Sequence, residues 1–271
     1  MMTEEPTEIF PYTGEELVQA DSYLRKLPVA LVLKERIRFD AIVTASDIIA
    51  KAFNDLQLFT TRAGSDVDNF ANGGSAFALG LCWTIVDQLH AVRQLLKAPL
   101  GTTAGPYARR FLGASEPATH LRNHMDHLAG NLDNLANSKG PRLPLFGCLS
   151  YFYCAKSNPS GGHIITIMSG ALHGGDLLPC VNPAGKTLSL PTGLFTLSAS
   201  NHELDLALSI GSLRDWLRRV ESKIESDILT SLTDQGISEE DKLVAMATLG
   251  GGLTIVMKIE SGTEPDAERR G

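Results

Sequence analysis

The chain has 271 residues, of which 43% are hydrophobic and 20% are charged, a balance typical of a globular protein with a substantial core. Its formal net charge is −7, with 24 Lys and Arg against 31 Asp and Glu. Because duplex DNA is bound mainly through neutralisation of its phosphates, this balance argues against a DNA-binding protein. A local cluster of cations that contacts RNA is still compatible with it.

Targeting signals and cysteine spacing suggest the compartment. The sequence contains no run of the roughly 18 unbroken apolar residues that a membrane span needs. Its first residues carry acids and no basic n-region, unlike a secretory signal. The cysteines, Cys82, Cys148, Cys154 and Cys180, show no C-x-x-C spacing, and Cys148 and Cys154 would share one side of a strand as reduced thiols. We therefore expect a cytoplasmic protein without membrane association.

Hydrophobic residues at helical spacing dominate the first half of the chain. After an acidic lead over 1–13 that we expect to be mobile, Pro28 ends a short predicted helix over 15–27. Long amphipathic helices are predicted over 35–59 and 75–98. Their apolar positions are Ile37, Ala41, Ile48, Ala52, Leu56 and Phe59 in the first, and Leu81, Ile85, Leu89, Val92 and Leu96 in the second.

A third helix is predicted over 117–137, after a connecting loop over 99–116. Ser115 is a suitable N-cap, Pro117 fits the first turn, and Gly140 lies beyond the end of the helix. We expect its apolar stripe to face the bundle and its polar side to lie opposite. The stripe comprises Leu121, Met125, Leu128, Leu132 and Leu135, and the polar side Arg122, Asp126, Asn123, Asn134, His127, His120, Asn131 and Gly130.

The period of the sequence changes after residue 142. Residues 145–155 and 163–172 are rich in β-branched and aromatic side chains and flank a Gly-containing turn, a pattern typical of a β-hairpin. Further strands are predicted over 188–199, 203–208 and 252–259. An amphipathic helix over 212–232 has Leu213, Trp216, Leu217, Val220, Ile224 and Ile228 on its apolar face.

Together these elements predict an α+β fold. We expect an antiparallel helical bundle over 1–142, followed over 143–260 by a small antiparallel β-sheet and a further amphipathic helix packed on the bundle. Residues 261–271 are polar and predicted to be disordered.

One stretch of the third helix carries a chemically suggestive pattern. It reads Arg122-Asn123-His124-Met125-Asp126-His127, with a polar residue directly after the arginine and a histidine five positions from it. This pattern resembles the R-x4-H signature of the HEPN superfamily, the higher eukaryotes and prokaryotes nucleotide-binding domains. Its position on a later helix of a bundle is similar too. The resemblance covers roughly residues 35–140 and does not include the β-rich part.

The resemblance implies an activity. Many HEPN proteins are metal-independent endoribonucleases of toxin or defence systems, in which the Arg and His of two subunits meet in one cleft. By that similarity, Arg122 would hold the scissile phosphate, His127 would act as general acid or base, and Asn123 would orient them. The helix over 117–137 would then form a homodimer interface and RNA would be the substrate.

Other residues near the motif have both functional and ordinary interpretations. Arg109 and Arg110 are candidates for a small positive patch that contacts RNA, and Asp126 is a further candidate for substrate binding. Equally, Arg122 and Asp126 have the i,i+4 spacing of a simple surface ion pair, and the ordinary interpretation of His127 is a solvated histidine. In that case the helix would serve a non-catalytic dimerisation or interaction module.

Two further constellations involve histidines. His120, His124 and His127 share a side of the helix, so a metal site that includes Asp87 of the preceding helix is a second alternative. The preceding helix carries a second stripe, formed by Trp83, Asp87, His90 and Gln94. Either Asp87 and His90 lie beside the Arg122 face, or the stripe only forms hydrogen bonds across the contact between the helices. No motif calls for a cofactor, because neither Gly250–Gly252 nor His173–Asp176 has the context of a phosphate-binding loop.

Overall fold

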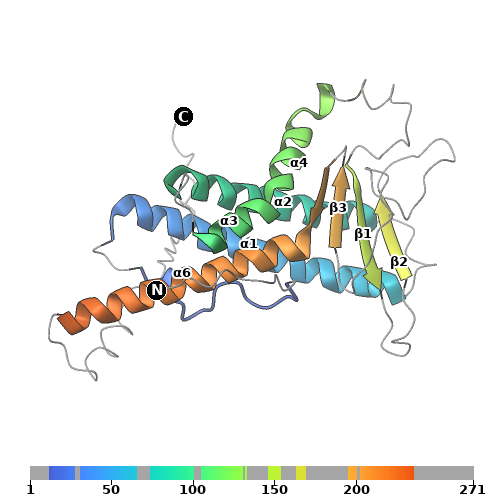
Figure 1. Ribbon diagram of the computed structural model, residues 1–271. Coiled ribbons are helices and arrows are strands. Elements are labelled where there is room, and N and C mark those ends of the chain that lie inside the picture. Colours follow the sequence, from blue (N-terminus) through green and yellow to red (C-terminus); the bar gives the residue numbers. More distant parts are fainter. Residues whose placement is uncertain are drawn as a thin grey trace, which may run out of the picture.

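A computed structural model describes residues 12–27, 31–65, 74–100, 105–130, 132, 146–153, 163–168, 195–199 and 202–234. Two long helices, α1 (Leu33–Ser65) and α2 (Gly74–Leu100), pack along each other as predicted (Figure 1). Buried α1 side chains recur three to four residues apart, at Ile42, Ala45, Ile49, Ala52, Phe53 and Leu56. Ile37 and Ile48, which we had placed on the same apolar face, are exposed, so the buried face is rotated from the predicted one.

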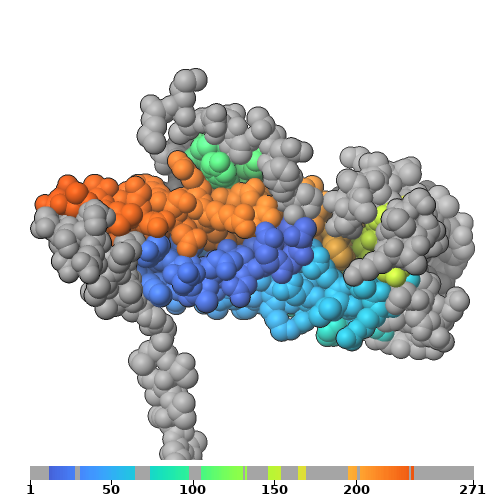
Figure 2. Space-filling model, turned by 90° about the horizontal axis from the view of Figure 1, so that it is seen from below, coloured from blue at the N-terminus to red at the C-terminus, as the bar shows by residue number. Residues whose placement is uncertain are grey.

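The segment before α1 is not the helix predicted over 15–27. It contains only one 3₁₀ turn, η1 (Tyr23–Arg25), and otherwise runs as irregular chain that packs against α1 and α6. Its apolar side chains are nonetheless buried, among them Tyr12, Leu17 and Leu24. Figure 2 shows these N-terminal residues lying along α6. Tertiary contacts, rather than helical hydrogen bonds, therefore fix this segment.

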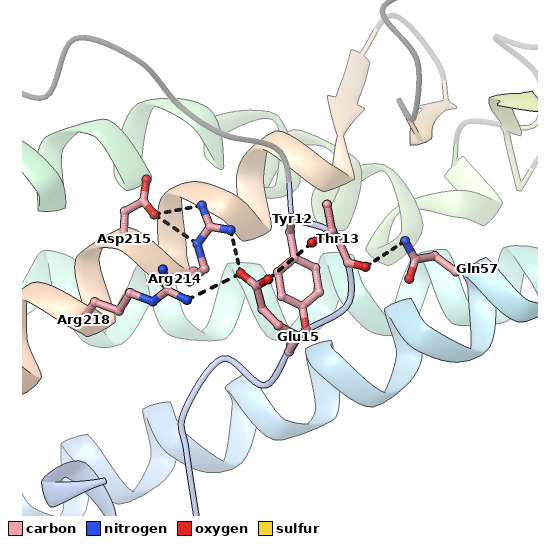
Figure 3. Close-up of polar contacts among 7 residues, drawn as sticks. All are labelled: Tyr12, Thr13, Glu15, Gln57, Arg214, Asp215 and Arg218. Atoms are coloured by element: carbon pink, nitrogen blue, oxygen red, sulfur yellow. Dashed lines mark hydrogen bonds and ion pairs between the residues drawn. The ribbon is translucent and has the colours of Figure 1, made fainter. Parts of the chain in front are cut away.

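A polar network attaches the segment to α6 (Leu206–Asp234) (Figure 3). The guanidinium of Arg214, whose side chain is only 8% exposed, contacts Glu15 at 2.7 Å and Asp215 at 3.0 Å. Gly14 adopts a φ of 105°, which lets the chain turn between Tyr12 and Glu15 at a position where a side chain would be strained.

Two short helices occupy the region where we had predicted a loop and one long helix. Helix α3 (Pro106–Ala114) lies within the predicted loop over 99–116, with its proline in the first turn. Helix α4 (Glu116–Asp126) follows immediately and is much shorter than the predicted 117–137. Residue 127 interrupts it, and residues 128–130 are helical again. Most of the residues beyond 130 that belonged to the predicted helix lie outside the described residues.

The four described strands form one antiparallel sheet in the order β2-β1-β3-β4. They are β1 (Cys148–Tyr153), β2 (His163–Met168), β3 (Phe195–Ala199) and β4 (His202–Asp205). The predicted hairpin is confirmed, with Ser150 opposite Thr166. The predicted strand over 252–259, residues 1–11 of the predicted lead and the tail lie outside the described residues, whereas Tyr12, also part of that lead, is buried.

The last described helix begins earlier than predicted. Residues 203–208 were predicted as a strand and 212–232 as a helix, but β4 ends at Asp205 and α6 starts at Leu206. The cause is local: the Asp205 carboxylate accepts the backbone N–H of Leu208 at 2.9 Å, the hydrogen bond of a helix N-cap. The apolar face of α6 is as predicted, because Leu213, Trp216 and Leu217 are buried.

Helices and sheet share one hydrophobic core, which confirms the α+β class. Opposite residues Leu149, Leu197 and Leu204 lie on one face of the sheet and are fully buried. They belong to the same cluster as α2 residues such as Leu89 and α6 residues such as Ile210.

Helix α2 is the most apolar of the described helices. Over Gly74–Lys97 it is long and apolar enough to cross a bilayer by length and composition, with a mean hydropathy of 1.2 in its most apolar window. In that window 44% is buried inside the protein. Burial against α1 and the sheet is a sufficient reason for this composition.

Candidate functional site on helix α4

The position of α4 is set by a buried arginine of α2. The Arg93 guanidinium donates to the Leu112 carbonyl, at the C-terminal end of α3, and lies 3.3 Å from Ser115 Oγ. Ser115 Oγ in turn donates to the Phe111 carbonyl at 2.6 Å. A cation is favourable at this end of a helix, where carbonyls lack helical partners. Arg93, only 4% exposed, therefore clamps the corner between α3 and α4.

One side of α4 packs into the protein and the other faces solvent. Ala118, Leu121 and His124 are buried, and Met125 packs against the core, in line with the start of the predicted apolar stripe. The stripe does not continue: Leu132 is 51% exposed. Figure 1 shows the reason, because the far end of α4 rises away from the other helices.

Arg122 lies at the edge of this exposed side and holds two carboxylates. Its Nε is 3.2 Å from Asp87 Oδ1 of α2, and its Nη1 is 2.9 Å from Asp126 Oδ1 of α4. The Arg122 side chain is 38% exposed, and the two aspartates are more so. The simple i,i+4 ion pair is therefore present, and Asp87 does lie beside the Arg122 face.

His127 and Asn123 are exposed, and both lie on the open side of α4. His127 is the C-cap of the helix, and its backbone N–H donates to the Asn123 carbonyl at 3.1 Å. At about 100° per residue, five positions separate Arg122 and His127 by roughly 140° around the helix axis. One copy of α4 therefore directs these two side chains toward different sides.

The contact between α2 and α4 contains several polar groups near Arg122. Burial, followed by the charges of Arg122 and Arg93, lowers the pKa of His90 below its ordinary value. His90 Nε2 lies 3.3 Å from the Gln94 side-chain nitrogen. In the part of the chain that the structure describes, the buried polar atoms without a hydrogen-bond partner are His90 Nδ1, Arg93 Nε and Thr119 Oγ1.

The remaining sequence candidates are not assembled around Arg122. Arg109 and Arg110 lie on α3 rather than in a loop. Trp83, from the same stripe as Asp87 and His90, donates its indole N–H to the Phe146 carbonyl at 3.1 Å. Of the cysteines within the described residues, Cys82 and Cys148 are buried free thiols; burial raises the pKa of Cys148 to about 11 and that of Cys82 further, so neither is a nucleophile.

The three histidines of the α4 region do not form a metal site. His124 is 7% exposed, and His120 stacks on His202 of β4 with ring centroids 4.5 Å apart and planes inclined by 11°. Among the residues that the structure describes, no group of three His, Cys, Asp or Glu side chains is arranged to hold a metal. The structure therefore does not bring His120, His124, His127 and Asp87 together as the metal alternative requires.

Sequence reasoning missed Arg93, Thr119 and His202. Arg93 had a usable signal, since it follows His90 by three residues and so extends the polar stripe of α2. His202 had none, because only the fold brings β4 against α4.

A groove of about 620 Å³ lies away from α4, lined by α1 side chains and by Phe195 of β3.

No family model, curated protein or solved structure matches this chain. The fold therefore establishes only a structural class, that of a helical α+β protein. Its motif over 122–127 lies on helix α4, one side of which faces solvent. The resemblance of residues 122–127 to the HEPN signature stays a prediction, since no comparison tests it.

Proposed function

We propose that the protein is an HEPN-like RNA-binding protein that cleaves RNA without a metal ion. The proposal assigns Arg122, Asn123 and His127 to a site shared by two copies of the chain. One observation supports it above the others: the side chains of all three residues are exposed or half-exposed on α4, where a polynucleotide can reach them.

The two carboxylates beside Arg122 are compatible with this role. Exposed ion pairs contribute only about 0–1 kcal/mol each, so an RNA phosphate can replace one of them at small cost. A guanidinium binds phosphate through two parallel hydrogen bonds, and this geometry favours Arg over Lys at such a position. Until RNA arrives, Asp87 and Asp126 hold the Arg122 side chain in place.

The proposal requires a second copy of the chain. Because Arg122 and His127 of one α4 diverge by roughly 140°, a single helix does not bring both to one phosphate. Two helices packed through their exposed sides would bring Arg122 of one copy toward His127 of the other. The histidine would then exchange the proton of a 2′-hydroxyl or of the leaving oxygen, while Asn123 orients the groups.

The test is RNA cleavage in EDTA with three matched variants. We expect the wild type to cleave total RNA, and Arg122→Ala and His127→Ala each to lower the rate at least about 100-fold. Arg219→Ala, which removes an exposed arginine of α6 far along the chain, is expected to cleave normally. The proposal is wrong if the wild type does not cleave, or if the Arg122 and His127 variants cleave like Arg219→Ala.

A second candidate is a non-catalytic interaction module that associates through α4. The two ion pairs of Arg122 favour it, because Asp87 and Asp126 already neutralise the positive charge that would bind a phosphate. This candidate predicts no cleavage by any variant. It also predicts that the chain forms a dimer in sedimentation experiments. Asn123 is exposed in the middle of the open side, and Asn123→Arg should weaken this dimer.

A further inference from the structure

The contact between α4 and the edge of the sheet is built around histidines. His120 of α4 stacks on His202 of β4, with ring centroids 4.5 Å apart. His124, one turn after His120 on α4, is buried, with 7% of its surface exposed. The two elements that meet here are more than seventy residues apart in sequence (Figure 1).

The strand register explains why His202 points toward α4. His202 pairs with Ala199, and Leu204 pairs with Leu197, so these side chains share the face of the sheet that is covered by the helices. Glu203 pairs with Ser198 and therefore points to the opposite face. The carboxylate next to His202 in sequence is thus directed away from the stacked rings.

The charges that act on His202 come from the histidines themselves. Burial contributes most to lowering the pKa of His202, and the charges of His120 and His124 contribute next. The other titratable and charged groups on the elements around the stack are distributed as follows. On α2, Asp87 contacts Arg122 and Arg93 contacts Ser115. Helix α3 carries Arg109 and Arg110, and α4 also carries Glu116, Asp126 and His127. Strand β3 has no titratable side chain, and Asp205 caps α6.

We propose that the His120–His202 stack is a proton-operated joint, which holds α4 against the edge of the sheet when its imidazoles are neutral and releases the helix on acidification. Neutral rings stack favourably and bury their faces. Two imidazolium rings at the same separation repel each other, and the buried His124 offers no compensating negative charge. Acid therefore weakens this contact, whereas the Arg93 clamp at the other end of α4 keeps its charge.

The joint belongs to the fold and does not depend on the proposed ribonuclease activity. Its consequence for the candidate site follows from position, since Arg122 and Asn123 lie on the same helix within three residues of His120. Release of α4 from β4 would change how these side chains are presented to a second molecule.

Two measurements on the full chain test the joint. NMR titration of the histidine rings should give His202 a pKa below its ordinary value, and His120→Gln should raise it. Hydrogen exchange of α4 amides, corrected for intrinsic rates, should become about tenfold faster between pH 7.5 and 5.5 in the wild type. In His202→Gln and in His120→Gln this pH dependence should disappear.

His127→Gln is the matched control for titration, because it removes an exposed histidine from the same helix outside the stack. It should leave the pKa of His202 and the pH dependence of exchange unchanged. Either an unaltered His202 titration in His120→Gln or a pH-independent exchange of α4 in the wild type overturns the proposal. Neither readout involves RNA, so failure here is distinct from failure of the proposed activity.

Discussion

At the scale of single residues, Asp205 carries a charge in an unfavourable setting. It caps α6 by accepting the Leu208 N–H at 2.9 Å. Burial nevertheless raises the pKa of its carboxyl group to about 6, against the opposing effect of hydrogen bonds from Leu208 and Ala207. The folded chain thus binds this proton more tightly than the unfolded chain does. The resulting stability is fully present below about pH 4 and is lost as the pH rises through about 6.

Asp205→Asn tests this linkage, because asparagine keeps the capping oxygen and removes the charge. We expect its free energy of unfolding at pH 7.5 to exceed that of the wild type by about 1–2 kcal/mol. The difference should shrink as the pH falls to 4, as measured by urea titration at each pH. Asp227→Asn, which removes a 63% exposed carboxylate paired with Lys223, is the control and should change stability by less than about 0.5 kcal/mol. Parallel pH profiles for wild type and Asp205→Asn would contradict the linkage.

At the scale of elements, α4 shows how far periodicity can be trusted. A helical stripe of leucines predicted a long helix that faces the bundle throughout. The structure buries only the first part, because α4 is interrupted at His127 and its far end leaves the bundle. Periodicity describes which residues share a face, but it contains no information on where the neighbouring surface ends.

Two leucines of the predicted stripe allow a direct test. Leu121 is fully buried, whereas Leu132 is 51% exposed. Leu121→Ala should lower the free energy of unfolding by about 2–5 kcal/mol, because it leaves a cavity in the core. Leu132→Ala should change it by less than about 0.5 kcal/mol. Chemical denaturation of both variants checks this, and equal losses would mean that the stripe continues into the protein as the sequence suggested.

The other elements were predicted to different degrees for physical reasons. The apolar faces of α2 and α6 are long and regular, and both predictions are confirmed. Residues 15–27 contain apolar side chains but need no helix to bury them, since α1 and α6 provide the surface. The start of α6 was misplaced because a buried strand and a buried helical turn have similar composition, and only the Asp205 cap separates them.

At the scale of the whole molecule, the sheet completes the core of the helices. The fully buried side chains Leu149 and Leu197 join the same hydrophobic cluster as α1 and α2 residues, and Arg214 of α6 anchors Glu15 near the start of the described chain (Figure 3). Segments near both ends of the described part of the chain thus stabilise one structure. The sequence left open one composite domain or two closely packed parts divided near residue 142, and the described residues on both sides of that boundary contribute to one hydrophobic cluster.

A fragment of residues 1–142 should therefore fail to fold cooperatively. Without β1, β3 and α6, the apolar faces of α1 and α2 are left exposed to water, and the N-terminal segment loses its partner on α6. We expect the fragment to bind a hydrophobic dye, to show poorly dispersed amide signals, and to unfold without a sharp transition. The full chain is the control. A sharp transition with native-like dispersion in the fragment would show that the helices form an independent domain.

The sequence by itself determined the α+β class, the long helices α1, α2 and α6, and the β1–β2 hairpin, and it offered the contact of Asp87 with Arg122 only as one of two alternatives. These follow from patterns within one element or between helices adjacent in the chain. The tertiary structure alone decided where α4 ends, that His124 is buried, and that His202 stacks on His120. These properties depend on which distant surfaces meet, and a local pattern of polar and apolar residues does not encode the position of its partner.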